Sequence, residues 1–340
     1  MSKLPRHHDR EHSESMNQRP QIAVVIPCYK VSHSIVGVVE AVMEFADLVL
    51  CVDDACPEYS GRRVQDSISH SRLRVLFNEQ NLGVGGAVKA GYMAALEAGC
   101  SVVIKLDGDG QMDPAKIPLL ASRILKGESD YCKGNRFHDL DYLKGMPALR
   151  VFGNSLLSVF TKVSSGYWQI MDPTNGYTAI GRSALSAIPL DKISDGYFFE
   201  SDMLFRLNVA RAVVTDVPLK AHYGDESSNL RIGKVVGPFA FGNLRNFIKR
   251  IFYSYFLRDF NLASLELLAG TLLTLFGGIT GLRAWTHSIE SGVPATAGTV
   301  MLAGLPIIIG FQLLLSFLNY DIQNVPRTAL SSFEHPTGEA

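Results

Sequence analysis

Three side chains with oxygen donors follow one short apolar run of this sequence, in the stretch KLDGDGQMDP at residues 105–114. Asp107, Asp109 and Gln111 alternate there, and alternate residues of an extended strand end point the same way. Carboxylate and amide oxygens suit a hard divalent cation, and a cation held by two or three protein oxygens keeps positions open for a substrate diphosphate. The spacing therefore favours a Mg²⁺ or Mn²⁺ site formed by these three residues over a plain Asp/Gly turn.

Two other interpretations of this stretch, a calcium loop and a helix cap, explain fewer of its residues than a Mg²⁺ or Mn²⁺ site does. A calcium loop of the EF-hand type requires a glycine at its sixth position and a glutamate at its twelfth, where this sequence has Met112 and Pro118. Asp113 precedes Pro114, and an aspartate before a proline at the first helical position is an ordinary helix cap. Capping explains Asp113 and leaves the two earlier aspartates for the cation.

A second polar signal is the glycine-rich stretch NLGVGGAVKAG at residues 81–91. It is not a dinucleotide fingerprint, because Val88 stands where a third glycine should follow Gly83 and Gly85. A glycine-rich helix start can hold a phosphate through its backbone N–H groups, or it can let a helix pack closely on its neighbour. The sequence alone leaves both interpretations open.

Short apolar runs alternate with helical patterns between residues 21 and 237. Continuous apolar runs of this length indicate buried parallel strands. The expected strands are residues 21–27, 48–54, 73–78 and 101–107. The expected helices are residues 33–46, 58–70, 84–98 and 114–126. This alternation predicts an α/β domain with a mainly parallel sheet, in which ligands collect at the carboxyl ends of the strands.

Composition limits the class of protein. The chain has 340 residues and a formal net charge of -1, which argues against a nucleic-acid-binding protein held by phosphate contacts. Residues 1–20 are polar, lack an apolar period and lack a signal-peptide core, so we expect a disordered tail. The five cysteines include no CxxC pair, which predicts reduced structural thiols.

The C-terminal third contains two long apolar runs. Residues 262–285 and 293–320 are each long enough to cross a hydrocarbon core, which takes about 20 apolar residues. We expect two transmembrane helices within residues 262–320, preceded by an amphipathic juxtamembrane helix at residues 238–261. Basic residues at the open end of this hairpin place the N-terminal domain and a tail at residues 321–340 in the cytoplasm. These basic residues are Arg245, Lys249, Arg250, Arg258 and Arg327.

Taken in order, seven stretches resemble the family 2 glycosyltransferases (GT2) with the GT-A fold, and among them the polyprenyl-phosphate sugar synthases of the dolichyl-phosphate mannose synthase and undecaprenyl-phosphate glucosyltransferase type. The stretches are VVIPCYK (24–30), VDDACPEYS (52–60), NLGVGGAVKAGY (81–92), KLDGDGQMDP (105–114), GNRF (134–137), RVFGN (150–154) and DPTNGYTAI (172–180). The resemblance covers about residues 21–235 and implies a Rossmann-like GT-A domain over residues 21–237. The hairpin is also similar to that of the bacterial lipid-phosphate enzymes, which implies the bacterial inner membrane.

The resemblance also implies roles for individual residues. Asp107 and Asp109 would be catalytic, and together with Gln111 they would hold the metal and the donor diphosphate. Further nucleotide-sugar contacts would come from Pro27, Tyr29, Asp54, Gly83 and Lys89. The acceptor phosphate would be held by Arg136, Arg150 and Asn154. The sequence departs from the family near residues 220–234, where a characteristic arginine is replaced and the candidate cations are His222, Arg231 and Lys234.

The implied reaction is transfer of a hexose, with inversion, from a nucleotide diphosphate sugar to a polyprenyl phosphate, with UDP expected over GDP as the nucleotide. The alternative acceptor is a sugar hydroxyl of a lipid-linked glycan. FFESDML (198–204) offers Glu200 and Asp202 for this reaction, with Asp202 as the base. A scaffold or sugar-lipid binding module without catalysis is disfavoured by the complete acidic strand end. Gly277 and Gly281 form a GxxxG spacing that would pack helices within one chain or between the protomers of a homo-oligomer.

Overall fold

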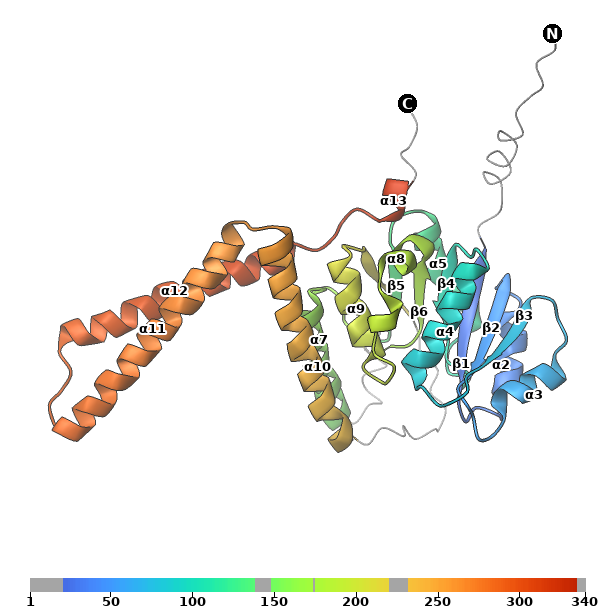
Figure 1. The fold of residues 1–340 in the computed structure, drawn as a ribbon, viewed down its shortest axis with the longest axis horizontal. Coiled ribbons are helices and arrows are strands. Elements are labelled where there is room, and N and C mark those ends of the chain that lie inside the picture. Colours follow the sequence, from blue (N-terminus) through green and yellow to red (C-terminus); the bar gives the residue numbers. More distant parts are fainter. Residues whose placement is uncertain (1–20, 138–147, 174, 220–231, 335–340) are drawn as a thin grey trace, which may run out of the picture.

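The computed structural model describes residues 21–137, 148–173, 175–219 and 232–334, which form an α/β domain and a long helical hairpin (Figure 1). The sheet has seven strands in the order β3-β2-β1-β4-β6-β5-β7, and among these strands β6 alone runs antiparallel to its neighbours. The strands are β1 (Ile22–Cys28), β2 (Leu48–Asp53), β3 (Leu73–Phe77), β4 (Val102–Lys105), β5 (Tyr131–Asn135), β6 (Thr178–Gly181) and β7 (Val214–Pro218). The winding direction reverses between β1 and β4, and such a switch point is where α/β sheets bind ligands.

Helices cover both faces of the sheet, as expected for an α/β domain. One face carries α2 (Ile35–Val42), α3 (Ser60–Ser67) and α5 (Ile117–Leu125). The other face carries α4 (Val84–Glu97), α8 (Arg182–Ala187) and α9 (Phe199–Val209). All six residues of β2 are buried, because both of its faces are covered, and this explains why its sequence is a continuous apolar run. The four strands and four helices expected from the sequence are confirmed, with ends shifted by a few residues.

Two further helices lie side by side at the end of the domain nearest the hairpin, namely α7 (Ala148–Ser165) and α10 (Ile232–Phe252) (Figure 1). A π-helical segment, η5 (Tyr253–Arg258), follows α10 and leads into the hairpin helices α11 (Leu262–Ser291) and α12 (Ala297–Gln323). Asn261 starts α11 with a capping box, because its side chain accepts from the N–H of Ala263 at 3.0 Å while Ser264 Oγ accepts from the N–H of Asn261 at 3.1 Å.

The helices of the hairpin pack on each other through small residues. A Cβ built at Gly277 would lie 2.5 Å from the carbonyl oxygen of Ala303, and one at Gly270 would lie 2.9 Å from that of Gly310. The most apolar 18-residue stretches of α11 and α12 are only 22% and 17% buried, whereas a core helix of a soluble domain is mostly buried. Both are long and apolar enough to cross a membrane, and Gly277 serves packing within the chain.

After α12 the chain returns to the α/β domain. Leu330 packs against the core, and its N–H donates to both carboxylate oxygens of Asp130 at 2.9 and 3.0 Å. Arg211 donates to the carbonyl oxygen of Asn324 at 3.0 Å. The short helix α13 (Ser331–Glu334) lies beside α8 (Figure 1). The described part of the expected tail is therefore packed on the domain, so the domain holds the chain on both sides of the hairpin.

All five cysteines are buried and free, as the sequence predicts.

Candidate active site

The acidic strand end lies at the switch point of the sheet. Asp107 follows β4, and the chain after β1 lies next to it, because Ser34 Oγ donates to the carbonyl oxygen of Gly108 at 2.7 Å. Tyr29 follows β1 and is 44% exposed, so its ring is available to a ligand. Pro27 lies within β1, in register with Val52 of β2. Three residues predicted to bind the nucleotide sugar, Pro27, Tyr29 and Asp107, therefore lie at neighbouring strand ends.

Asp107 is held by a buried lysine. Lys105 Nζ donates to Asp107 Oδ1 at 2.8 Å and lies 3.5 Å from Glu200 Oε1 of α9. The side chain of Lys105 is 2% exposed, whereas that of Asp107 is 33% exposed. Burial lowers the pKa of Lys105, but the carboxylates of Asp107 and Glu200 outweigh this, so its pKa lies well above the usual range. The lysine is therefore a fixed cation beneath the acidic strand end.

The remaining residues of the stretch form a turn and a helix cap, and the predicted metal roles of Asp109 and Gln111 stay predictions. Asp109 Oδ1 accepts from the N–H of Gln111 at 3.0 Å, which folds the chain into a turn after Asp107. Asp113 accepts from the N–H of Ala115 at 2.9 Å and caps the 3₁₀ helix η3 (Pro114–Lys116), so the predicted capping role is confirmed.

These donors fit a hard divalent cation that a ligand completes. Among the described residues no group of three His, Cys, Asp or Glu side chains could hold a metal by itself. Asp107 and Asp109 supply only carboxylate oxygens, which are the donors that Mg²⁺ and Mn²⁺ prefer. One oxygen of Asp107 already accepts from Lys105, so few protein oxygens remain for a cation here.

The glycine-rich start of α4 is occupied by the protein itself. The N–H groups of Gly85 and Gly86 donate to the carbonyl oxygen of Asp195 at 2.7 and 3.2 Å. Lys89 Nζ pairs with Asp195 Oδ1 at 2.5 Å and donates to the carbonyl oxygen of Ile193 at 2.9 Å. Gly83 has φ of 86°, which a glycine adopts without strain, and a Cβ there would lie 2.8 Å from the same Asp195 carbonyl. These contacts favour the packing interpretation of this stretch, and the predicted contacts of Gly83 and Lys89 with the donor stay predictions.

Asp54 is likewise engaged within the chain. It accepts from Asn78 Nδ2 at 2.8 Å and from the N–H groups of Leu82 and Gly83 at 3.0 and 2.7 Å. The side chain is buried, so it shapes the loop between β3 and α4. The predicted contact of Asp54 with a nucleoside stays a prediction, and it would have to form beside these three hydrogen bonds.

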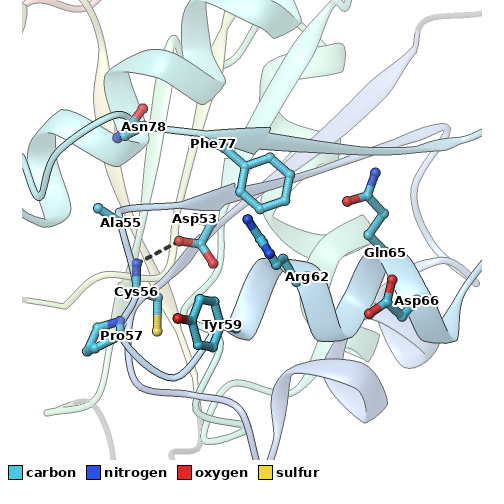
Figure 2. A pocket seen from close by; sticks show the side chains of 10 residues that line it. All are labelled: Asp53, Ala55, Cys56, Pro57, Tyr59, Arg62, Gln65, Asp66, Phe77 and Asn78. Atoms are coloured by element: carbon cyan, nitrogen blue, oxygen red, sulfur yellow. Dashed lines mark hydrogen bonds between the residues drawn. The ribbon is translucent and has the colours of Figure 1, made fainter.

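A cavity of about 780 Å³ opens at the edge of the sheet, between the end of β3 and α3 (Figure 2). Two exposed rings, Tyr59 and Phe77, border it, and Asp53 fixes its loop by accepting from the N–H groups of Cys56 and Gly61 at 2.7 and 2.6 Å. None of the residues predicted to bind the nucleotide sugar lines this cavity. The lining residues are Asp53, Ala55, Cys56, Pro57, Tyr59, Arg62, Gln65, Asp66, Phe77 and Asn78.

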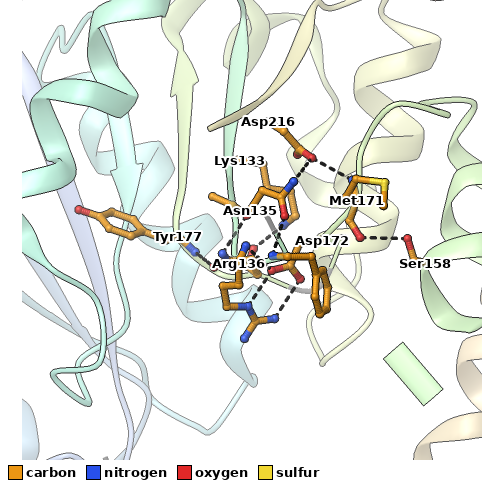
Figure 3. Close-up of polar contacts among 11 residues, drawn as sticks. Lys133, Asn135, Arg136, Ser158, Met171, Asp172, Tyr177 and Asp216 are labelled. Atoms are coloured by element: carbon orange, nitrogen blue, oxygen red, sulfur yellow. Dashed lines mark hydrogen bonds and ion pairs between the residues drawn. The ribbon is translucent and has the colours of Figure 1, made fainter. Parts of the chain in front are cut away.

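Arg136 belongs to a polar network at the end of β5 (Figure 3). Its Nε and Nη2 donate to the two carboxylate oxygens of Asp172 at 2.7 and 2.9 Å, and Asp172 is fully buried. Such a bidentate pair fixes the plane of the guanidinium, of which the side chain stays 25% exposed. Arg150 and Asn154 lie on α7, and their side chains, like residues 138–147 and 220–231, lie outside the described part of the structure. The predicted acceptor roles of these residues, and the expectations for His222, Arg231 and Lys234, stay predictions.

Asp202 is engaged by partners within the protein. It is fully buried, and its carboxylate accepts from the N–H of Ser194 at 3.0 Å and from Asn246 Nδ2 of α10 at 2.9 Å, with Arg206 Nε at 3.4 Å. These contacts favour a structural role, in which Asp202 joins α9 to α10. The neighbouring carboxylate that does face the site is Glu200, through Lys105.

Two residues beside the site, Lys105 and Lys133, were not predicted from the sequence. Lys133 of β5 is fully buried and donates to the carbonyl oxygen of Asn175, and burial lowers its pKa to about 8. A signal was present, because a lysine inside a strand that is otherwise buried is rarely tolerated without a partner. The strand pattern could not reveal the partners, which come from residues 175–200.

A pH-dependent stability follows from Asp216 of β7. Burial raises the pKa of Asp216 from 3.8 to about 6, although it accepts from the N–H of Met171 and from Asn135 Nδ2. A carboxyl that holds its proton more tightly when folded loses stability as it ionises, so this contribution is present below pH 3.8 and is lost as the pH rises to about 6. We expect Asp216→Asn to gain roughly 1–3 kcal/mol relative to wild type over this window. Urea unfolding at a series of pH values would measure this gain, and the exposed Asp191→Asn should show none.

Comparisons with known proteins agree with this geometry. Residues 23–188 match the family model described as glycosyl transferase family 2. The UDP-N-acetylglucosamine--dolichyl-phosphate N-acetylglucosaminyltransferase of Methanococcus voltae is 26% identical over 230 residues, covering 62% of this chain and 91% of that protein. The undecaprenyl-phosphate mannosyltransferase of Micrococcus luteus is 29% identical over 226 residues, covering 64% of this chain and 90% of that protein.

Solved structures give the same fold. Glucosyl-3-phosphoglycerate synthase from Mycobacterium tuberculosis, in complex with Mn²⁺, UDP and glucosyl-3-phosphoglycerate, matches with a TM-score of 0.51 and 18% identity, covering 71% of this chain and 82% of that chain. Mannosyl-3-phosphoglycerate synthase from Rubrobacter xylanophilus matches with a TM-score of 0.53 and 15% identity, covering 74% and 79%. At these identities the likeness shows the fold alone. Residues 23–188 therefore match glycosyl transferase family 2 within a domain of the GT-A fold, and two helices long and apolar enough to cross a membrane follow it.

Proposed function

We propose that this glycosyltransferase moves a hexose, with inversion, from a nucleotide diphosphate sugar to a polyprenyl phosphate at the cytoplasmic face of a bacterial inner membrane. The observation that carries the proposal is the position of the acidic strand end in a domain whose α7 and α10 present apolar side chains to the outside. The relatives from Methanococcus voltae and Micrococcus luteus are both named for transfer to a polyprenyl-type phosphate, which supports the acceptor class.

The donor would bind at the ends of β1 and β4. Asp107, Asp109 and Gln111 would face its diphosphate, and Tyr29 would lie beside its nucleoside. A divalent cation bound there would supply stabilisation of the negative charge on the departing nucleoside diphosphate. The Mn²⁺ and UDP named for the glucosyl-3-phosphoglycerate synthase structure support a divalent cation and favour UDP over GDP.

The acceptor would be positioned by Arg136. A phosphate is already an anion at neutral pH, so it attacks without giving up a proton to a base and requires orientation above all. Asp172 holds the guanidinium of Arg136 in one plane at 2.7 and 2.9 Å. A fixed guanidinium can bind a phosphate with little further ordering. The buried contacts of Asp202 argue against a hydroxyl acceptor that depends on this residue as its base.

The surface of α7 and α10 explains how a lipid would reach this site. Apolar side chains on the two neighbouring helices are 46–70% exposed, which is expensive in water and favourable at a lipid interface. The chain runs from α10 through η5 into the apolar hairpin (Figure 1). The exposed apolar side chains of α7 and α10 include Leu156, Val159, Phe160, Phe241, Leu244, Ile248 and Phe252.

The orientation in the membrane rests on fewer charges than the sequence indicates. Arg250 is buried in an ion pair with Asp321, which neutralises its charge, whereas the exposed Arg258 donates to the carbonyl oxygen of Val209 and keeps its charge. Arg245 and Lys249 on α10 still favour the cytoplasmic side.

Activity of two variants would test the acceptor class. We expect Arg136→Ala to lower transfer to a polyprenyl phosphate by roughly 100-fold, since hydrogen bonds to charged groups contribute about 1.5–3 kcal/mol each. Arg136→Lys retains a charge beside Asp172 and should recover part of the loss. Asp202→Asn should lower thermal stability and leave transfer within about threefold. The assay presents a panel of nucleotide sugars and identifies products by mass. Loss of transfer in Asp202→Asn with Arg136→Ala unaffected would instead indicate a hydroxyl acceptor.

A further inference from the structure

Two lysines lie buried in the sheet beneath the proposed donor site. Lys105 of β4 and Lys133 of β5 both stand in register with Thr178 of β6, so their side chains share one face of the sheet. Their residues are 1% and 0% exposed, and a lysine is almost never buried this fully without partners. Lys133 donates to the carbonyl oxygen of Asn175, whereas Lys105 has a different set of partners.

Lys105 connects three segments that are far apart in the sequence. Its Nζ donates to Asp107 Oδ1 at 2.8 Å and to the carbonyl oxygen of Gly176 at 3.3 Å, and it lies 3.5 Å from Glu200 Oε1. Two carboxylates therefore share one cation. Glu200 is 13% exposed and balances the charge of the lysine from α9, while Asp107 extends further toward solvent.

We propose that Lys105, with Glu200, is a positioning residue that fixes the carboxylate of Asp107 for donor binding. The contact occupies Oδ1 of Asp107 and leaves Oδ2 to a ligand. Glycine follows Asp107 in the chain, so the strand end is conformationally permissive and the lysine supplies the restraint. A carboxylate that is ordered before the ligand arrives binds more tightly, because the ordering cost has already been met. This inference rests on the proposed function, since it concerns the same donor site.

Gly176 provides the room in which this contact forms. A Cβ built at Gly176 would overlap Lys105 Nζ and would lie 2.7 Å from Asp107 Oδ2. Both atoms are the far ends of flexible side chains, so the fold can accommodate an alanine by moving them. Gly176→Ala therefore displaces the lysine and the carboxylate while every charge is kept.

The matched control is a second glycine of the same region. A Cβ built at Gly181, at the far end of β6, would lie 2.9 Å from Ile124 Cγ2, which is also the end of a side chain. Gly181 has φ of -75°, so alanine is compatible with its backbone. Gly181→Ala thus makes a similar overlap on the same strand without touching Asp107.

The test is the affinity of the full chain in detergent for UDP in the presence of Mn²⁺, measured by titration calorimetry. We expect Gly176→Ala and Lys105→Met each to weaken UDP binding by at least tenfold, and Gly181→Ala to stay within twofold of wild type. Unchanged affinity in both Gly176→Ala and Lys105→Met, with wild type binding normally, would overturn the inference. A wild-type chain that binds no UDP with Mn²⁺ would instead overturn the proposed donor site itself.

A double variant separates positioning from stability. Lys105→Met leaves Glu200 buried without its cation, so its thermal midpoint should fall. Adding Glu200→Gln removes this unpaired charge and should restore most of the midpoint, while UDP affinity stays at least tenfold weaker. Recovery of affinity together with the midpoint would show that Lys105 serves folding only and would contradict the positioning role.

Discussion

Asp107→Asn is expected to lower the rate of sugar transfer by roughly 10³-fold or more while the domain stays folded, a loss typical of removing a charge that acts on the transition state. The variant keeps the size of the side chain and removes the carboxylate that Lys105 presents at the strand end. Lys105 stays partnered by Glu200, so the buried cation is not abandoned. Initial rates with saturating donor and acceptor would measure the loss, and the thermal midpoint would confirm folding.

Asp113→Asn is the matched control for this experiment. It makes the same chemical change six residues later, and asparagine caps a helix as well as aspartate does. The side chain of Asp113 serves η3 by accepting from the N–H of Ala115. We expect transfer within about twofold of wild type. Asp107→Asn with more than a tenth of the wild-type rate would contradict the assignment of Asp107 to the donor site.

The sequence predicted those parts of the fold that depend on local patterns. Apolar runs identified β1 to β4; in β2 and β4 every residue is buried, whereas the edge strand β3 is only partly covered. Asp113 could be assigned to a cap because its partner is two residues away. The antiparallel β6 and its neighbour β5 were not predicted, since their short sequences TAIG and YCKGN show no continuous apolar run.

The contacts that the sequence could not show are long-range. Gly85 and Lys89 resemble a phosphate site locally, but their partner is Asp195, more than 100 residues later in the chain. Asp202 is a plausible base by its motif, and only the fold shows that its carboxylate accepts a hydrogen bond from Asn246 of α10. Buried polar groups take whichever partner the tertiary structure supplies, so a motif can identify a candidate but cannot reveal whether its side chain is already satisfied.

A buried ion pair fastens the hairpin to the domain. Arg250 of α10 donates to both carboxylate oxygens of Asp321, at 2.6 and 3.0 Å, near the end of α12. Tyr255 of η5 and Trp168 also donate to this carboxylate, at 2.6 and 3.0 Å. The side chains of the pair are only 3% and 4% exposed. Three separate segments, around Trp168, Arg250–Tyr255 and Asp321, thus meet at one carboxylate at the base of the hairpin.

Removing one partner of this pair is expected to have the largest effect on stability. Asp321→Ala leaves the Arg250 charge buried and should lower the free energy of unfolding by about 3–5 kcal/mol. Replacing both, as in Arg250→Met with Asp321→Leu, removes the unpaired charge and should recover most of this loss. Urea unfolding in detergent, followed by near-UV circular dichroism, would measure both.

The control is another acidic residue of the same hairpin. Glu266 of α11 accepts from Ser316 Oγ of α12 at 2.8 Å, but this contact is exposed. Exposed polar contacts contribute little, so Glu266→Gln should change stability by less than about 1 kcal/mol. Equal stability of Asp321→Ala and Glu266→Gln would contradict the role of the buried pair. A large loss confined to Asp321→Ala would show that the buried pair stabilises the junction between the domain and the hairpin, whereas an exposed carboxylate of the hairpin does not.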